Sequence, residues 1–411
     1  MKIPRCSKIY IFIGYLVLKY RSYLPSMASY MNTEPTSTRA GRYVTQPARY
    51  RAFIPAALPP DPSIAWDEEL QDLLSRADRA LGRLDGVAAV LPNPELFVAM
   101  YVRKEAVLSS QIEGTRATLL DILDYETTGV LVKDVDEVVN YIRAMNKGLE
   151  RLTTLPPSLR LIREIHAELL KGVRGEHRAP GEFRTTQNWI GPPGSTINNA
   201  TFIPPPPHEM QAALGDLEKY IHKDDKLPAL VKNALIHAHF EGIHPFLDGN
   251  GRVGRLLITF ILVHDNILKR PLLYLSYYFK RNRQEYYARL NNIINKGDWE
   301  GWIKFFLKGV YEVSNQATET AQRIIALQEQ DRARLAGIPN GLKLIDQLFF
   351  NPLITINEIR RLTGISHATA GRLVKQMIQL DILDEITGYA RNRKFMYKDY
   401  FTILKEGVED S

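Results

Sequence analysis

The chain has 411 residues, 45% of them hydrophobic, which indicates two or three domains with enough apolar material for genuine cores. Its net charge is +7, but residues 1–51 hold nine Lys or Arg and one Glu, a charge of +8, so the remaining residues sum to −1. This distribution argues against a nucleic-acid-binding surface spread over the chain. Cys6 is the only cysteine, which excludes internal disulfides and a cysteine-based metal site and suits a reducing compartment.

The first 28 residues share some features with a secretory leader. Basic residues precede an apolar run at residues 9–18, which is too short to span a bilayer, and residues 26–28 form a small-x-small cleavage pattern. Because Lys19 and Arg21 separate the run from that pattern, we expect a cytoplasmic protein without a membrane span. Export and a mis-assigned start are the alternatives.

Residues 1–50 form a basic leader, and its last part, residues 32–50, is rich in Thr, Ser, Pro and Arg and is predicted to be disordered. Residues 53–60 predict an extended arm, and helices are expected at residues 66–84 and 94–112.

Glu113 occupies an unusual place for a carboxylate. Pro94 suits the first turn of a helix, and Gly114 suits the position just after its end. Glu113 therefore lies in the last turn, where it opposes the helix dipole and needs a cationic partner. A solvated surface glutamate is the alternative.

Three helices are expected next, at residues 119–131, 135–152 and 159–170. They are followed by a segment rich in Gly, Pro and Asn, residues 188–205, in which apolar residues alternate without helical spacing. These residues are Trp189, Ile197, Phe202 and Ile203. The pattern predicts a β-hairpin, and an ordinary long loop is the alternative.

Residues 244–255, His-Pro-Phe-Leu-Asp-Gly-Asn-Gly-Arg-Val-Gly-Arg, form the most informative stretch, here called the signature segment. Its Gly-rich turn leads into an apolar helix, and such a helix N-terminus binds anions through its free N–H groups and its dipole. Arg252 and Arg255 share a helix face and can hold neighbouring phosphates. Asp248 suits Mg²⁺, and His244 suits a general base. The segment therefore indicates a nucleoside triphosphate site beside a proton acceptor.

Two other interpretations of this segment fit less well. Residues 249–254 match the dinucleotide fingerprint G-x-G-x-x-G, but a helical pattern precedes them and no acidic residue follows at the required distance. His237 and His239 lie near His244 in the sequence. Residues at positions i and i+2 of a helix point in different directions, which argues against a zinc site.

Further helices are expected at residues 209–222, 227–240, 274–279, 283–295, 299–316 and 317–335, the last being a polar-rich linker. Tyr286 and Tyr287 either wall an adenine pocket or pack in the core.

Residues 341–405 have the element order of a winged helix-turn-helix. Its expected helices and strands lie at residues 342–349, 356–362, 366–380, 382–386 and 394–397. Ser366 suits an N-cap, and the basic residues Arg372 and Lys375 on the would-be recognition helix permit DNA contact. Residues 341–411 nevertheless hold ten basic and nine acidic residues, so docking of a protein is the alternative.

The signature segment resembles that of the Fic family of nucleotidyl transferases, His-Pro-Phe-x-Asp-Gly-Asn-Gly-Arg-x-x-Arg, at every fixed position. The resemblance implies that His244 deprotonates a protein Ser, Thr or Tyr hydroxyl, which attacks the α-phosphate of ATP and releases pyrophosphate. It implies Mg²⁺ at Asp248 and a nucleotide-binding set made of Phe246, Gly249, Asn250, Gly251, Arg252 and Arg255. From the residues alone, Phe246 is favoured to pin the loop to the core.

Two more elements take a role from this resemblance. Ser109-x-x-x-Glu113-Gly114 is similar to the Fic inhibitory motif, whose glutamate pairs with the second signature arginine, here Arg255, and blocks placement of the γ-phosphate. The expected hairpin corresponds to a flap that pairs with the backbone of the target. Its docking residues would be Trp189, Ile197, Thr201 and Phe202.

The expected fold is mainly α. A helical region with the inhibitory helix (51–130) precedes a Fic helical core with a β-hairpin flap (131–315), a linker helix (316–340) and a C-terminal winged helix-turn-helix (341–405). The expected function is transfer of AMP to a protein target or to the chain itself, restrained by Glu113. A DNA-binding regulator with a nucleotide-sensing or self-modifying Fic domain is the alternative. A homodimer is common among such proteins, but the sequence offers no readable interface.

Overall fold

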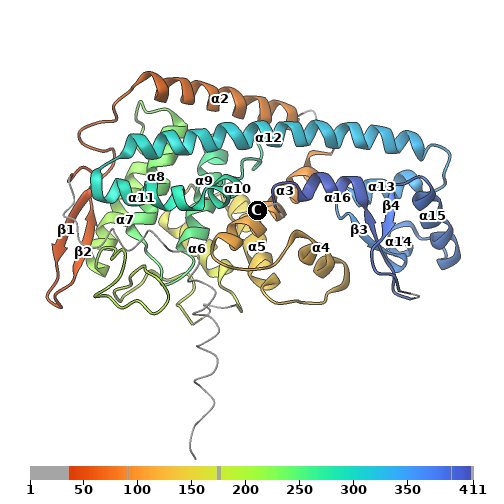
Figure 1. The fold of residues 1–411 in the computed structure, drawn as a ribbon, viewed down its shortest axis with the longest axis horizontal. Helices are drawn as coiled ribbons and strands as arrows, with labels where there is room; N and C mark the ends of the chain where they lie inside the picture. Colours follow the sequence, from red (N-terminus) through yellow and green to blue (C-terminus); the bar gives the residue numbers. More distant parts are fainter. Residues whose placement is uncertain (1–36, 90, 92, 174–176, 390, 409–411) are drawn as a thin grey trace, which may run out of the picture.

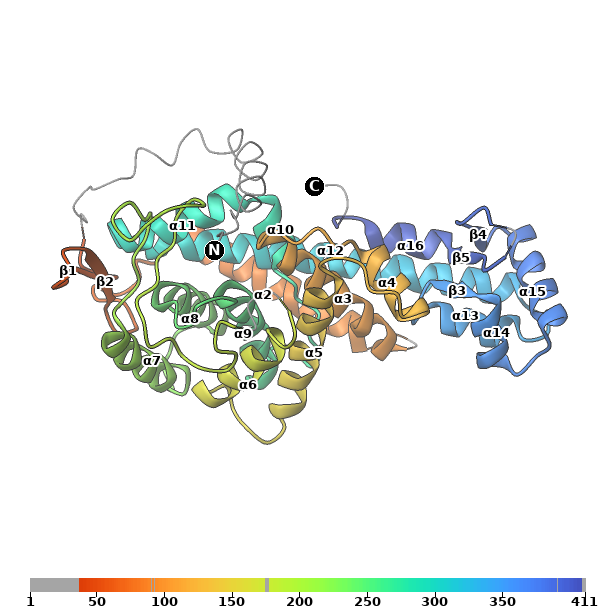
Figure 2. The same ribbon diagram turned by 90° about the horizontal axis from the view of Figure 1, so that it is seen from below.

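The computed structural model describes residues 37–89, 91, 93–173, 177–389 and 391–408. Nearly all regular structure in these residues is helical, as predicted (Figure 1). The molecule is elongated: a helical body contains the signature segment, and residues 341–408, here called the C-terminal unit, lie toward the far end of one long helix (Figure 2).

The described chain begins with a β-hairpin. Strands β1 (Gly41–Thr45) and β2 (Arg51–Pro55) pair in antiparallel register, with Tyr43 opposite Phe53. The prediction that residues 32–50 are disordered is therefore wrong for β1, because β2 supplies its backbone partners and the buried Phe53 ring anchors the pair. The leader-like run at residues 9–18 lies outside the described residues.

One long helix runs through most of the molecule. α12 (Trp299–Arg334) starts at Asp298, whose side chain caps it by accepting from Gly301 N–H at 3.0 Å. The helices expected at residues 299–316 and 317–335 are thus one continuous helix. α2 (Glu68–Ala89) packs along its body half (Figure 1).

The remaining helices of the body surround the signature segment. They are α3 (Pro94–Ile112), α4 (Leu119–Thr128), α5 (Val135–Arg151), α6 (Leu159–Leu169), α7 (Pro207–Ile221), α8 (Ala229–Ile243), α9 (Asn250–His264), α10 (Ser276–Arg281) and α11 (Arg283–Lys296). α8 and α9 are buried on almost every side, as expected of helices that are apolar all round. The signature turn is therefore held between two core helices.

The segment expected to be a regular hairpin is a loop. Residues 188–205 fold back on themselves through a single antiparallel bridge between Ile190 and Phe202. Trp189 donates from Nε1 to the carbonyl of Ser195 at 3.0 Å within this loop. Pro and Gly residues fill the stretch between the bridge partners, and Pro cannot donate to a strand ladder, which explains why only one bridge forms.

The C-terminal unit combines short helices with a small sheet. Its elements are α13 (Gly341–Leu348), β3 (Leu353–Thr355), α14 (Ile356–Thr363), α15 (His367–Gln379), β4 (Leu383–Glu385), β5 (Lys394–Tyr397) and α16 (Lys398–Lys405), and the antiparallel strand order is β3-β5-β4. Ser366 caps α15 by accepting from Thr369 N–H at 3.2 Å. β3 and α16 were not predicted. Assignment as a winged helix-turn-helix, DNA contact and a homodimer stay predictions.

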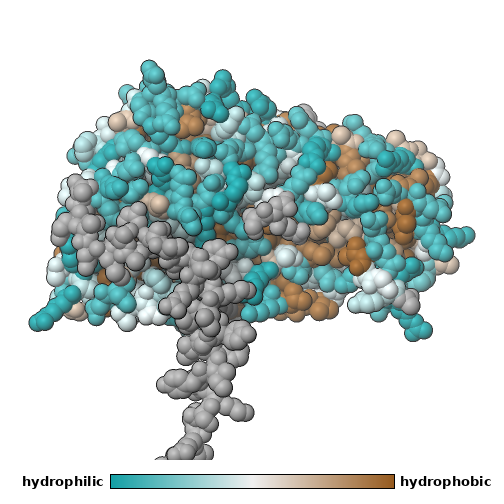
Figure 3. Space-filling model, viewed as in Figure 1, coloured by the Kyte–Doolittle hydropathy of each residue, from teal (hydrophilic) through white to brown (hydrophobic). Residues whose placement is uncertain are grey.

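Within the described residues, no helix is both long and apolar enough to cross a bilayer. The face drawn in Figure 3 is mostly hydrophilic, and most of its apolar surface lies on the half that contains α4 and the C-terminal unit.

Candidate functional site

The signature turn is shaped by Asn250. Its Oδ1 accepts from Phe246 N–H at 2.8 Å, and its Nδ2 donates to Phe246 C=O at 2.9 Å. Asn250 is 2% exposed, and both ends of its amide are engaged by this backbone. Asn250 therefore positions the loop, and its expected contact with phosphate oxygens stays a prediction.

Phe246 pins the same turn to the core. Its fully buried ring stacks on His166 of α6, with ring centroids 3.7 Å apart. His166 accepts from Gly181 N–H at Nδ1 (2.8 Å), so its Nε2 donates to Asp248 C=O (3.0 Å). Burial lowers the pKa of His166 to about 4, which keeps the ring neutral. The sequence did not indicate this role of His166, because no motif near it along the chain links it to the signature turn.

His244 lies at the C-terminal end of α8 with φ +50°, a left-handed conformation that turns the chain into the signature loop. Arg184, 2% exposed, holds this corner by donating from Nε to His244 C=O at 2.9 Å. Burial, assisted by the charge of Arg184, lowers the pKa of His244 to about 4. The imidazole is therefore neutral at physiological pH and free to accept a proton.

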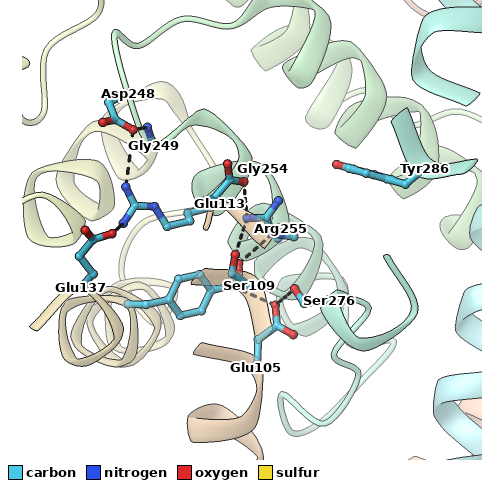
Figure 4. Close-up of polar contacts among 12 residues, drawn as sticks. Glu105, Ser109, Glu113, Glu137, Asp248, Gly249, Gly254, Arg255, Ser276 and Tyr286 are labelled. Carbon is cyan, nitrogen blue, oxygen red and sulfur yellow. Dashed lines mark hydrogen bonds and ion pairs between the residues drawn. The ribbon is translucent and has the colours of Figure 1, made fainter. Parts of the chain in front are cut away.

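The two signature arginines are buried and engaged by carboxylates. Arg252 places Nη1 3.3 Å from Glu137 Oε2 of α5 and Nη2 3.6 Å from Asp248 Oδ1. Arg255 donates from Nη2 to Glu113 Oε1 at 2.7 Å (Figure 4). Both guanidiniums are thus paired within one helical turn of α9.

The end of α3 holds Arg255 through two residues. Besides the ion pair with Glu113, Arg255 donates from Nε to Ser109 Oγ at 2.7 Å and from Nη2 to Ser109 C=O at 3.0 Å. Gly114 follows with φ +99°, a conformation that favours glycine after a helix end. Ser109 and Glu113 therefore meet the second signature arginine, the partner that the Fic resemblance implies.

Glu113 lies directly against the signature turn. A Cβ on Gly251 would come within 2.4 Å of Glu113 Oε1, so only glycine leaves room for the carboxylate there. Burial alone would raise the pKa of Glu113, but Arg255 outweighs it and holds the pKa below its usual value. The carboxylate is therefore ionised at neutral pH.

Two other carboxyls near Arg255 were missed by sequence analysis. Glu105, 2% exposed, accepts from Tyr141 Oη at 3.0 Å and from Ser276 Oγ at 2.5 Å (Figure 4). Glu241 of α8 has a buried Oε1 without a hydrogen-bond partner, close to the space that a Cβ on Gly254 would occupy. Burial raises the pKa of each to about 7. A glutamate in a helix gives no local signal of such burial.

An open cavity of about 1790 Å³ adjoins the site. Glu113, Glu137 and Glu241 line it, together with residues of α11 and of the 188–205 loop, which include Tyr287, Ile190, Thr201 and Phe202. Of the other expected docking residues, Trp189 is 43% exposed and Ile197 is half-buried, and neither lines the cavity.

Tyr286 and Tyr287 lie in different surroundings, one in the core and one at the cavity. Tyr286 is buried, and its hydroxyl lies 2.9 Å from His237 Nε2, so it packs in the core. Tyr287 lines the cavity and is the one of the two that could face a ligand.

The described residues contain no group of three or more His, Cys, Asp or Glu side chains arranged to hold a metal. Asp248 is instead a single carboxylate, with its side chain 39% exposed, at the mouth of the anion-binding turn. One carboxylate beside phosphate oxygens is the donor set that Mg²⁺ commonly takes with nucleotides.

Two models of one protein family match the part of the chain that contains this site. The family model described as Fic/DOC family N-terminal matches residues 71–150, and the Fic/DOC family model matches residues 156–262. A Fic family protein from Desulfovibrio desulfuricans G20 has a similar fold, with a TM-score of 0.52 and 17% identity over 82% of this chain and 97% of that protein.

The matches to curated relatives cover only part of this chain and part of each relative. A probable protein adenylyltransferase of Aquifex aeolicus is 28% identical over 212 residues, covering 50% of this chain and 58% of the relative. The protein adenylyltransferase Fic of Drosophila grimshawi is 29% identical over 203 residues, covering 47% of this chain and 38% of the relative. The chain thus spans about half the length of the curated relatives it matches. The chain therefore carries both Fic/DOC family regions, at residues 71–150 and 156–262, and shares the fold of a Fic family protein.

Proposed function

We propose that the chain is a protein adenylyltransferase, which transfers AMP from ATP to a Ser, Thr or Tyr hydroxyl of a protein target or of the chain itself. The observation that carries the proposal is the convergence of a neutral His244, Asp248 and two buried arginines on the N-terminus of α9. The names of the Aquifex and Drosophila relatives support the same reaction class.

In this reaction the neutral imidazole of His244 accepts the proton of the target hydroxyl. The hydroxyl oxygen forms a bond to the α-phosphorus of ATP, the bond to the bridging oxygen breaks, and pyrophosphate leaves. The N–H groups at the start of α9 and the guanidinium of Arg252 face the developing negative charge. Catalysis would therefore come from positioning and charge stabilisation with one acid–base group.

Asp248 and the nucleotide phosphates would hold Mg²⁺ at the start of α9. The ion supplies charge neutralisation for the phosphate chain when bound. Within the protein, Asp248 is oriented by Gly249 N–H, which donates to its Oδ1 at 2.6 Å. Arg252 lies near the same oxygen, so the carboxylate is fixed before any ligand arrives.

We infer that Glu113 inhibits this reaction. Its carboxylate is paired with the guanidinium of Arg255, which would otherwise hold the γ-phosphate. The same carboxylate lies close to Gly251 in the anion-binding turn. A triphosphate entering that turn would be repelled by the negative charge of Glu113, and it would find Arg255 already paired. Inhibition would end when the Glu113 side chain withdraws.

The test is transfer of label from α-labelled ATP with magnesium, onto the chain itself and onto lysate proteins. Glu113→Gly should raise labelling by at least about tenfold, equivalent to about 1.4 kcal/mol. Adding His244→Ala should lower labelling by about 10²- to 10⁴-fold, since the proton acceptor is lost. Chelation of magnesium should abolish it.

Glu164→Gln serves as a matched control, because Glu164 of α6 pairs with Arg151 of α5 at 2.7 Å and does not line the cavity. It should not reproduce the tenfold rise. If Glu113→Gly transfers no label to itself or to any lysate protein, transfer of AMP from ATP is excluded as the function.

A further inference from the structure

The C-terminal unit contacts both helices that flank Glu113. α3 ends immediately before Glu113, and α4 starts six residues after it. Both helices lie between α8 and α9, which hold the signature turn, and the C-terminal unit (Figures 1 and 2). The segment that carries the inhibitory glutamate is therefore bounded by elements that the C-terminal unit touches.

On α3 the contacts are made by two nearly buried cations. Lys104, 9% exposed, donates from Nζ to the carbonyl of Glu406 at 3.2 Å, just after α16. The guanidinium of Arg103, 6% exposed, lies over the Phe350 ring at 5.0 Å and also pairs with Glu126 of α4 at 2.9 Å. Burial of a lysine is costly, so Lys104 depends on the carbonyl that Glu406 presents.

On α4 the contacts come from the strands of the C-terminal unit. Asp124 forms an ion pair with Lys394 of β5. Asn351 donates from Nδ2 to Thr127 Oγ1 at 3.1 Å, and Thr127 Oγ1 lies 3.3 Å from the carbonyl of Leu353 in β3. α4 is thus bonded to two of the three strands.

α3 connects these contacts to the active site. Lys104 and Glu113 are nine residues apart on one helix, or about 14 Å at 1.5 Å per residue. Ser109 lies between them and binds Arg255 through both its hydroxyl and its carbonyl. Because hydrogen bonds weaken within a fraction of an ångström beyond their normal range, a small shift of α3 would weaken all three contacts with Arg255 together.

We propose that the C-terminal unit sustains the inhibition: by holding α3 and α4 in place it keeps Glu113 on Arg255, and loosening its contacts activates the enzyme. The proposal rests on the proposed function, since it concerns the regulation of that site. It assigns a role to a unit that lies outside the two matched Fic/DOC regions.

Charge reversal in the full-length chain provides the test. Asp124→Lys and Lys394→Asp each replace the ion pair with a like-charge contact, and each should raise self-labelling from α-labelled ATP by roughly fivefold, the scale of one such pair. The double variant, Asp124→Lys with Lys394→Asp, restores an opposite-charge pair and should return labelling to the wild-type rate.

Two controls isolate the mechanism. Lys375→Asp makes the same charge change on α15, where Lys375 is exposed, and should leave labelling unchanged. In a Glu113→Gly background, Asp124→Lys should add nothing, because the contact it weakens is already absent. Strong labelling by Glu113→Gly together with wild-type labelling by both single reversals would overturn the proposal while leaving the adenylyltransferase function standing.

Backbone hydrogen exchange in residues 109–115 gives a readout that does not depend on activity. Each single reversal should speed exchange there, and the double variant should restore protection. Unchanged exchange in both single reversals would also overturn the proposal. If Glu113→Gly fails to label anything but exchange responds as expected, the coupling stands and the proposed reaction fails.

Discussion

Arg255 is surrounded by three carboxyls that behave differently. Glu113 bonds it directly and is ionised, whereas the buried Glu105 and the half-buried Glu241 have pKa values raised to about 7 by loss of water around the carboxyl. The sequence could indicate Glu113, because the glycine after a helix end marks its position and the signature supplies a partner. It could not indicate Glu105, whose neighbours Tyr141 and Ser276 come from distant helices.

Burial of Glu105 predicts a stability that falls as pH rises. The carboxyl binds its proton more tightly in the folded state than at its ordinary pKa of 4.5, so between about pH 4.5 and 7 the folded state holds more protons than the unfolded state. Stability should therefore decline across this window, by at most about 1.4 kcal/mol per pH unit for one group.

Glu105→Gln should remove the contribution of Glu105. Urea unfolding of wild type and variant at pH 5.5 and pH 8 measures it: the variant should gain relative to wild type at the higher pH. A stability difference that does not change with pH would contradict the raised pKa of Glu105. Glu241 titrates in the same window, so the double variant with Glu241→Gln should be flatter still.

At the scale of elements, hydrophobic periodicity and caps located almost every body helix, since these signals are local. Asn250 shows where such reasoning ends: its side-chain amide bonds the backbone of Phe246, a positioning role that has no local signal in the sequence. The 188–205 loop is similar, because alternation predicted a hairpin while its prolines limit pairing to one bridge. Apart from the pair of Glu113 with Arg255, which the Fic resemblance implies, long-range contacts between helices were not predictable.

One such contact is the close approach of α5 and α9. A Cβ on Gly148 of α5 would lie 2.1 Å from the ring of Phe260 on α9, and Phe260 is fully buried. Gly148→Ala should therefore destabilise the protein by about 1–3 kcal/mol through overpacking, despite the better helix propensity of alanine.

The midpoint of urea unfolding checks this prediction. Phe260→Leu made together with Gly148→Ala frees space and should recover part of the loss, so the two changes should be non-additive. Equal stability of Gly148→Ala and wild type would mean that the two helices separate at little cost.

For the whole molecule, the sequence predicted a body followed by a smaller unit but not how the two are joined. The order of elements in residues 341–405 was readable from turns and caps, whereas the pairing of Asp124 with Lys394 links residues 270 apart in sequence and has no local signal. The same applies to Lys104 and Glu406. The contacts behind the regulation proposed for the C-terminal unit could therefore not be predicted from the sequence.

The continuity of α12 has a consequence for how the molecule unfolds. Its 36 residues share one ladder of hydrogen bonds, with Trp302 buried in the body near one end and Asp331 accepting from Tyr397 of the C-terminal unit at 2.6 Å near the other. Helix formation is cooperative, so melting of one half removes support from the other.

The four tryptophans all lie in the body, whereas far-UV circular dichroism reports helices throughout. Denaturation by urea should accordingly give the same midpoint by tryptophan fluorescence and by circular dichroism. An earlier transition by circular dichroism would show that the C-terminal unit melts alone. A shared midpoint would mean that the body and the C-terminal unit unfold together as one cooperative unit, although the sequence predicts them as separate domains.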